Sequence, residues 1–202
     1  MSSSAIFIMK NTILALALFF TSCKIFNNSG YTALLETNKS AIKPFNVSTI
    51  DSIVNYKQDF IAEEMDGDKL KEILKVKPFT WVYLWAPWCP HLSPAYFDGI
   101  ERVEKRYNGR VKPIIVSISY QLNTMHNFLK ESKFDKKVYI LSYAAYGDNM
   151  TPAMNKFHKQ IAPKGFFTRD KHAGHYLFKG TQLVYASYDM DSTVFKKYIG
   201  NY

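Results

Sequence analysis

The chain has 202 residues, 47% of them hydrophobic and 16% aromatic, and its formal net charge at pH 7 is +9. Without residues 1–22, which form a separate N-terminal segment, roughly 180 residues remain, enough for one domain with one sizeable hydrophobic core. The lysines are scattered among acidic residues rather than gathered in one block. This pattern predicts a solvated basic surface, with attraction to anionic lipid or polysaccharide as the functional alternative. The chain has no internal repeat, which excludes repeat architectures.

The N-terminal segment has the pattern of a cleavable lipoprotein signal. Lys10 and Asn11 precede the apolar run 13–20, and small residues then lead to Cys23, as in a lipobox. The apolar run is too short to span a bilayer, so we predict a lipoprotein signal peptide at residues 1–22. Cys23 is then the lipidated residue, carrying palmitate or a similar acyl chain. A plain secretory signal that leaves Cys23 as a free thiol is the alternative.

Lipidation at Cys23 also predicts where the mature protein is located. Its lipid would anchor it to a membrane of the bacterial cell envelope, facing the periplasm, where no nucleic-acid partner is expected. Lys24, which stands in place of Asp after the cysteine, resembles the signal that favours the outer membrane. Residues 23–44 are predicted to be a tether, because Asn, Ser, Thr and Gly are frequent there. Met1 and Met9 both stay open as the start of translation, since Met9 alone opens a conventional signal.

From residue 45 to residue 202 the pattern is that of one folded α/β domain. Residues 45–50 are predicted to form a first strand or an extended segment. Further strands are predicted at 79–85, 111–119, 137–141, 176–178 and 183–187, and helices after a turn at 66–68 and at 94–107, 124–130, 151–160 and 192–199. The run 79–85 is almost continuously apolar and aromatic, which is typical of a central strand covered on both faces. A hairpin and a final helix are expected to close the domain.

The strand at 79–85 leads into Trp85-Ala86-Pro87-Trp88-Cys89-Pro90, at a predicted helix start. This motif and the order of the elements resemble the thioredoxin fold, and within it the membrane-tethered TlpA/ResA group of the bacterial envelope. The resemblance implies an α/β, thioredoxin-like fold with a central mixed sheet flanked by helices. It also implies thiol/disulfide redox chemistry at Cys89. Because Cys23 is expected to carry lipid, Cys89 is the one remaining thiol of the chain.

Two positions depart from the pattern of that family. Its second active-site cysteine would stand at Leu92, and its cis-proline would fall near Ala173. A mixed disulfide formed at Cys89 therefore cannot be resolved within the chain and needs an external thiol. As an enzyme, the chain is expected to be a monothiol thiol-disulfide oxidoreductase without a cofactor. Its partners would be envelope protein thiols or a small thiol.

The chemistry expected of Cys89 follows from its place at a helix start. The helix dipole and unpaired backbone amides stabilise a thiolate there. His91, protonated or hydrogen-bonded to the sulfur, would lower the pKa of the thiol further, so we predict Cys89 and His91 as catalytic residues. The alternative is that Cys89 is a structural residue at the helix start, with Trp85 and Trp88 serving as packing.

A second resemblance points to copper. The segment 89–94, Cys-Pro-His-Leu-Ser-Pro, resembles a shortened form of the Cys-Pro-x-x-x-Cys-Pro motif of Sco-type copper proteins, and 170–177 resembles the segment that carries their histidine. The resemblance implies a copper or zinc site formed by Cys89, His172 and His175. The alternatives for the two histidines are surface positions or polarisation of the thiol.

A third function class is a redox-inactive interaction protein. It would bind a partner through exposed aromatic side chains, with Trp88, Tyr143 and Tyr146 as candidate anchors. The remaining histidines, His126 and His158, are predicted to be surface residues of helices. The sequence favours the monothiol enzyme over the copper-binding module and the interaction protein.

Overall fold

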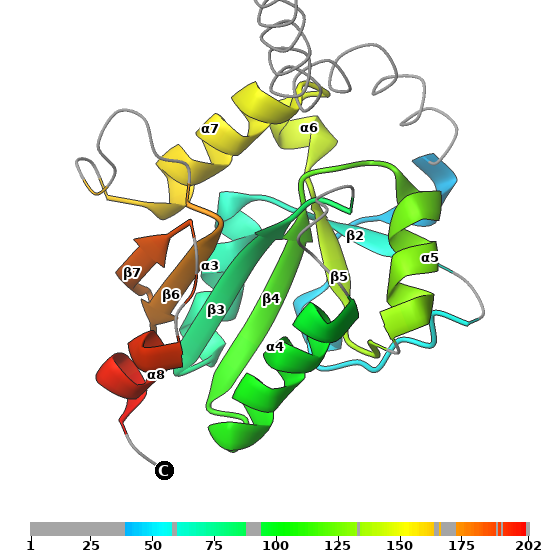
Figure 1. Ribbon diagram of the computed structural model, residues 1–202. Helices are drawn as coiled ribbons and strands as arrows, with labels where there is room; N and C mark the ends of the chain where they lie inside the picture. Colours follow the sequence, from blue (N-terminus) through cyan, green and yellow to red (C-terminus); the bar gives the residue numbers. More distant parts are fainter. Residues whose placement is uncertain are drawn as a thin grey trace, which may run out of the picture.

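The computed structural model describes residues 39–57, 60–87, 94–132, 134–163, 166, 173–188, 190 and 192–200. The predicted signal peptide and most of the predicted tether lie outside these residues. The strands are β1 (Ile42–Lys43), β2 (Ala62–Met65), β3 (Phe79–Trp85), β4 (Val111–Ser117), β5 (Val138–Leu141), β6 (His175–Lys179) and β7 (Gln182–Ser187). The helices are α3 (Gly67–Val76), α4 (Pro94–Arg106), α5 (Leu122–Ser132), α6 (Tyr143–Tyr146), α7 (Met150–Ile161) and α8 (Ser192–Ile199), with two short 3-10 helices, η1 (Lys39–Ala41) and η2 (Val47–Thr49) (Figure 1).

Within the described residues the strands form one mixed sheet in the order β1-β2-β5-β4-β3-β6-β7. The strands from β1 to β3 in this order are mutually parallel, whereas β6 is antiparallel to β3 and β7 to β6. Strand β3, helix α4 and strand β4 form a parallel β-α-β unit, and the β6–β7 hairpin with α8 closes the chain. This arrangement is the thioredoxin-like α/β fold that the sequence predicted.

Helices cover both faces of the sheet. Apolar side chains of α4, α5 and α8 pack against one face, and those of α3 and α7 pack against the other. Figure 1 shows α4 in front of β3 and β4 and α7 above the hairpin. The sheet is therefore the middle layer of three, as is usual when parallel strands are joined by helical crossovers.

Strand β3 is buried along its whole length, as its apolar run predicted. Side chains alternate between the two faces of a strand, so Trp81 and Trp85 enter the core under α4 and α8 while Val82 and Leu84 enter the core under α3 and α7. Both sets need apolar partners, which explains why no polar alternation is visible in the sequence. Each fully buried large side chain contributes about 1.5–3 kcal/mol to stability.

The helix ends follow local signals in the sequence. The Asp66 side chain caps α3 by accepting hydrogen bonds from the backbone amides of Asp68 and Lys69. After α4 the backbone takes positive φ angles at Asn108 (49°) and Gly109 (70°), a left-handed turn that ends the helix as predicted.

The structure differs from the predicted elements mainly before residue 66. The strand predicted at 45–50 is wrong: this segment contains η2, whose amide at Ser48 is capped by the Asn46 side chain. The sheet instead gains β1 and β2, and β1 lies upstream of the domain boundary predicted at residue 45. Among the described residues no helix is long and apolar enough to cross a bilayer.

Candidate functional site

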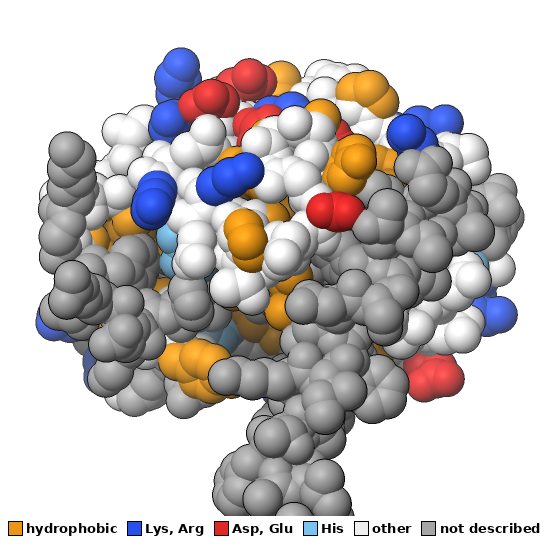
Figure 2. All heavy atoms as spheres, turned by 90° about the horizontal axis from the view of Figure 1, so that it is seen from above, with side chains coloured by type: hydrophobic (Ala, Val, Ile, Leu, Met, Phe, Trp, Pro, Cys, Tyr) orange, Lys and Arg blue, Asp and Glu red, His pale blue; other side chains and the backbone are white. Residues whose placement is uncertain are grey.

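The candidate site lies where β3 ends and the chain passes toward α4. Cys89 and His91, the predicted catalytic pair, fall between Pro87 and Pro94 and lie outside the described residues, as do His172 and Cys23. The described surroundings of this position are the carboxyl ends of β3 and β4 and the residues just before β6. Figure 2 looks onto this end of the sheet, where hydrophobic side chains are exposed beside the residues that are not described.

Backbone hydrogen bonds join three chain segments at this edge. The amide of Ile118 donates to the carbonyl of Trp85 at 2.8 Å, which extends the β3–β4 pairing by one step. The amide of Leu84 donates to the carbonyl of Gly174, also at 2.8 Å, and the amide of Gly174 donates to the carbonyl of Ser187 at 3.0 Å. The end of β3 is thus held from both sides, so the chain leaves the sheet at a fixed position.

Trp85 forms the floor of the site on the α4 side. Its side chain is completely buried, and its ring meets Phe97 edge-on at 5.3 Å and Phe128 at 5.4 Å. Within the described part of the chain its indole N–H has no hydrogen-bond partner. Such a buried donor costs about 1–3 kcal/mol. The chain therefore leaves β3 at a side chain that is packed among aromatic rings.

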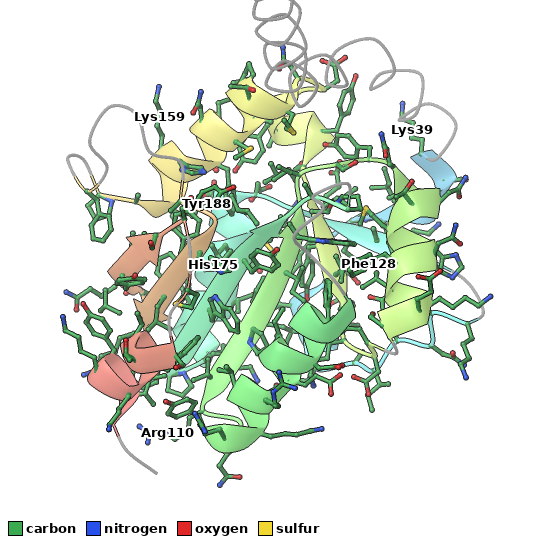
Figure 3. The ribbon with its side chains drawn as sticks, viewed as in Figure 1. Lys39, Arg110, Phe128, Lys159, His175 and Tyr188 are labelled. Carbon is green, nitrogen blue, oxygen red and sulfur yellow. The ribbon has the colours of Figure 1, made fainter. Side chains whose placement is uncertain are left out.

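His175 is the one predicted metal ligand that the structure describes, and it is a core residue (Figure 3). It lies opposite Tyr83 in the β3–β6 pairing, and its ring stacks on the Tyr83 ring at 4.6 Å with an interplanar angle of 6°. The indole N–H of Trp81 donates to Nδ1 of His175 at 3.2 Å. Burial lowers the pKa of His175 to about 4, so the imidazole is neutral at pH 7.

These contacts do not fit His175 as a copper or zinc ligand. An indole N–H can only donate, so Nδ1 must be the unprotonated nitrogen and Nε2 carries the proton. Metal binding at Nδ1 would break the bond to Trp81, and binding at Nε2 would move the proton to Nδ1, facing another donor. No group of three potential metal-binding side chains occurs among the described residues.

A buried tyrosine fixes the loop before β6. The Tyr176 hydroxyl donates to the carbonyl of Ala173 at 2.8 Å and lies within 2.9 Å of the ring nitrogens of His158. Ala173, near the position where the resemblance to the TlpA/ResA group would place a cis-proline, is itself buried. The loop that faces the end of β3 is therefore tied to α7 by a Tyr–His contact, a feature the sequence did not reveal.

The surface positions predicted for two histidines are wrong. His158 is only 7% exposed because it lies on the face of α7 that packs on Tyr176. His126 is half-buried on α5, where its Nε2 contacts the carbonyl of Tyr56 and its ring stacks on Phe60. Both imidazoles join elements that are distant in the sequence, so helical position alone could not identify them.

The aromatic anchors predicted for a protein partner are not supported by the residues that are described. Tyr146 is 4% exposed, and its hydroxyl accepts a hydrogen bond from the amide of Gly67 and contacts Gln160. Tyr143 is half-buried and meets Tyr120 edge-on at 6.5 Å. The prediction is wrong for Tyr146, because helix α6 turns this side chain into the core. Trp88 lies outside the described residues.

No protein-family model matches the chain, and no curated protein matches it. Among solved structures, the chain is similar to yeast Sco1 with copper bound, at 19% sequence identity and a TM-score of 0.38. The match covers 65% of this chain and 81% of that chain. The copper belongs to that protein, and the fold of the present chain rests on its own sheet topology.

Proposed function

We propose that this thioredoxin-fold protein carries out thiol/disulfide exchange in the bacterial cell envelope through a single cysteine, Cys89, in the manner of a one-cysteine member of the TlpA/ResA group. The observation that carries the proposal is the position of Cys89 in the sequence. It stands four residues after the buried strand β3 and five before α4, at the carboxyl edge of the parallel strands. Sites of open α/β sheets lie at this edge.

The steps of the proposed exchange follow from Cys89 being the one thiol available in the chain. The Cys89 thiolate attacks a disulfide of the partner, a mixed disulfide forms, and the other partner sulfur leaves as a thiolate. Because Leu92 stands where a second cysteine would be, an external thiolate then attacks the mixed disulfide and releases Cys89. One disulfide is consumed and one is formed, so the cycle needs only a partner disulfide and a second thiol.

The proposed location in the envelope makes these reactants accessible. Cys23 would carry the lipid that holds the protein at the outer membrane, facing the periplasm, and protein thiols or a small thiol of that compartment would serve as partners. Disulfides persist in such compartments, unlike in the cytosol. Lipidation of Cys23 also prevents it from acting as the second sulfur.

The test is the pH dependence of Cys89 alkylation in the lipidated full chain, with Cys89→Ser as the control for labelling elsewhere. We expect half-maximal alkylation well below the pH of about 8.5 typical of a free cysteine, and a mixed disulfide with glutathione detected by mass. His91→Ala is expected to raise that midpoint if His91 stabilises the thiolate. A midpoint near that of a free cysteine, without any mixed disulfide, would refute the proposal.

Copper addition separates the metal-binding alternative from thiol exchange. Protection of Cys89 from alkylation by stoichiometric copper, lost in His172→Ala, would replace the proposal by a metal site that includes this histidine. Unchanged alkylation in the presence of copper is the result expected for a thiol exchanger. His175→Phe is the matched control, because the described contacts of His175 leave it outside such a site.

A further inference from the structure

A second concave site lies between α3, the end of α7 and the β6–β7 turn, away from the carboxyl end of β3. Its volume is about 700 Å³. The turn residue Gly180 is hydrogen-bonded to Pro78, at the beginning of β3, whereas Cys89 follows the end of that strand. At about 3.3 Å per residue, the length of β3 places this turn roughly 20 Å from the carboxyl end of the strand. The cavity is therefore independent of the thiol site.

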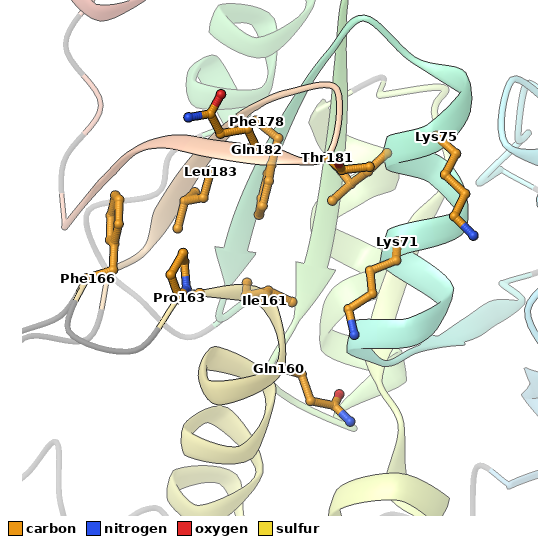
Figure 4. Close-up of a pocket in the computed structure, with 12 residues that line it drawn as sticks. Lys71, Lys75, Gln160, Ile161, Pro163, Phe166, Phe178, Thr181, Gln182 and Leu183 are labelled. Carbon is orange, nitrogen blue, oxygen red and sulfur yellow. The ribbon is translucent and has the colours of Figure 1, made fainter.

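The inner wall of this cavity is formed by buried apolar side chains. Leu74, Ile161, Phe178 and Leu183 line it, and each is at most 8% exposed. They come from α3, α7 and both strands of the hairpin. Figure 4 shows Ile161, Phe178 and Leu183 around one hollow, with Phe166 at its side. Phe166, at the edge of the site, is 40% exposed. A ligand with an apolar body would cover it.

The charged side chains among the described residues that line the cavity are both positive. Lys71 and Lys75, which lie one turn apart on α3, both line the cavity, and none of the described residues that line it is acidic. Lys71 pairs with Asp68 at 2.8 Å, outside the cavity. For Lys75 no carboxylate of the described residues lies within ion-pair distance. The side chains of Thr181 and Gln182 add hydrogen-bonding groups at the same opening.

We propose that this cavity binds a free small amphipathic carboxylate, with its apolar body between Phe178 and Leu183 and its carboxylate at Lys75. A volume of about 700 Å³ lies in the range of small-molecule sites, which are mostly apolar with a few placed polar groups. The lysine pair without a lining carboxylate favours an anion over a neutral or cationic ligand. The size favours one small molecule over a protein segment.

The probe for this site is naphthalene-2-acetate, with the neutral naphthalene-2-acetamide as its matched control, titrated against the full chain by fluorescence. We expect saturable binding of the acid and weaker binding of the amide. Lys75→Gln should weaken acid binding roughly two- to fivefold, the range for one exposed charge contact, and leave amide binding unchanged. Lys196→Gln makes the same charge change on the exposed surface of α8 and should have no effect.

A blocking variant tests the location of the site rather than its charge. Thr181→Trp places a large side chain at the exposed opening and should abolish binding without changing the core. The proposal is overturned if the acid shows no saturable binding, if acid and amide bind equally, or if Thr181→Trp binds like the unaltered chain. Competition by anionic phospholipid vesicles but not by unlabelled decanoate would also overturn it, because the occupant would then be a membrane lipid.

Discussion

The buried imidazole of His175 predicts a defined pH dependence of the stability of the protein. Burial lowers the pKa of His175 from 6.5 to about 4 in the folded state. The unfolded chain therefore binds the proton more readily, so stability is full above pH 6.5 and falls as the pH drops toward 4. Between pH 7.5 and pH 5 these two values give a loss of about 2 kcal/mol in the free energy of unfolding.

His175→Phe removes this titration but keeps a ring that can stack on Tyr83. The variant also leaves the Trp81 indole N–H without its acceptor, which should cost about 1–3 kcal/mol at every pH. The stability difference between the unaltered chain and His175→Phe should therefore shrink by about 2 kcal/mol on going from pH 7.5 to pH 5. Other titrating groups are common to both proteins and cancel in this comparison.

Urea unfolding followed by far-UV circular dichroism at several pH values provides the measurement. His175→Asn serves as a second variant, because its amide oxygen lies near the position of Nδ1 and can accept from Trp81 while the side chain does not titrate in this range. Both variants should show the same flattened pH profile despite different stability at pH 7.5. Parallel profiles for His175→Phe and the unaltered chain would show that His175 is not a neutral, desolvated group.

Further predictions concern an ion pair, a buried hydroxyl and the lipid anchor. The lysine partners of Asp51, Lys77 first, lower its pKa, so Asp51→Asn should cost about 1 kcal/mol or less near pH 7, and urea unfolding should show this difference vanishing as Asp51 protonates at low pH. Tyr176→Phe should destabilise the fold by about 1–3 kcal/mol and speed hydrogen exchange at the Gly174 amide, because Ala173 loses its donor; unchanged exchange would contradict this account. Cys23→Ala should move the protein from the membrane fraction to the soluble fraction, and continued membrane association would contradict lipidation there.

The elements predicted most accurately from the sequence are those whose burial pattern stays the same from one end to the other. Strand β3 was predicted with its observed ends because a strand covered on both faces needs an unbroken apolar run, and Pro78 and Pro87 flank it. Helix α8 was also predicted with its observed ends. In these cases local pattern and tertiary environment agree.

Strand β2 shows why other elements were missed. Its sequence, Ala-Glu-Glu-Met, has low strand propensity, and two adjacent carboxylates suggest an exposed segment. In the structure Glu63 pairs with Lys137, and Glu64 accepts hydrogen bonds from the hydroxyl and amide groups that follow β5. These partners lie 74 to 79 residues away in the sequence, so no local pattern could predict them.

The candidate site also contains features with local and with distant signals in the sequence. The position of the thiol stays a prediction: Trp-Cys-Pro after an apolar strand is a local signal, and Cys89 lies outside the described residues. The role of His175 could not be predicted, because its partner Trp81 is 94 residues away and a histidine near a predicted hairpin gives no sign of its hydrogen-bond direction. Only the packing of β3 against β6 shows that His175 is a neutral imidazole of the core rather than a metal ligand.

The neutrality of His175 limits what can activate Cys89. A cationic imidazole near the sulfur would stabilise the thiolate, but a ring whose pKa is about 4 carries no charge at pH 7. If Cys89 has a low pKa, the stabilisation must come from groups other than His175, such as the amino end of α4, His91 or His172, and His175→Phe should leave the alkylation midpoint unchanged. A midpoint that rises in His175→Phe as much as in His91→Ala would show instead that the buried ring is coupled to the sulfur, against the geometry of its bond to Trp81.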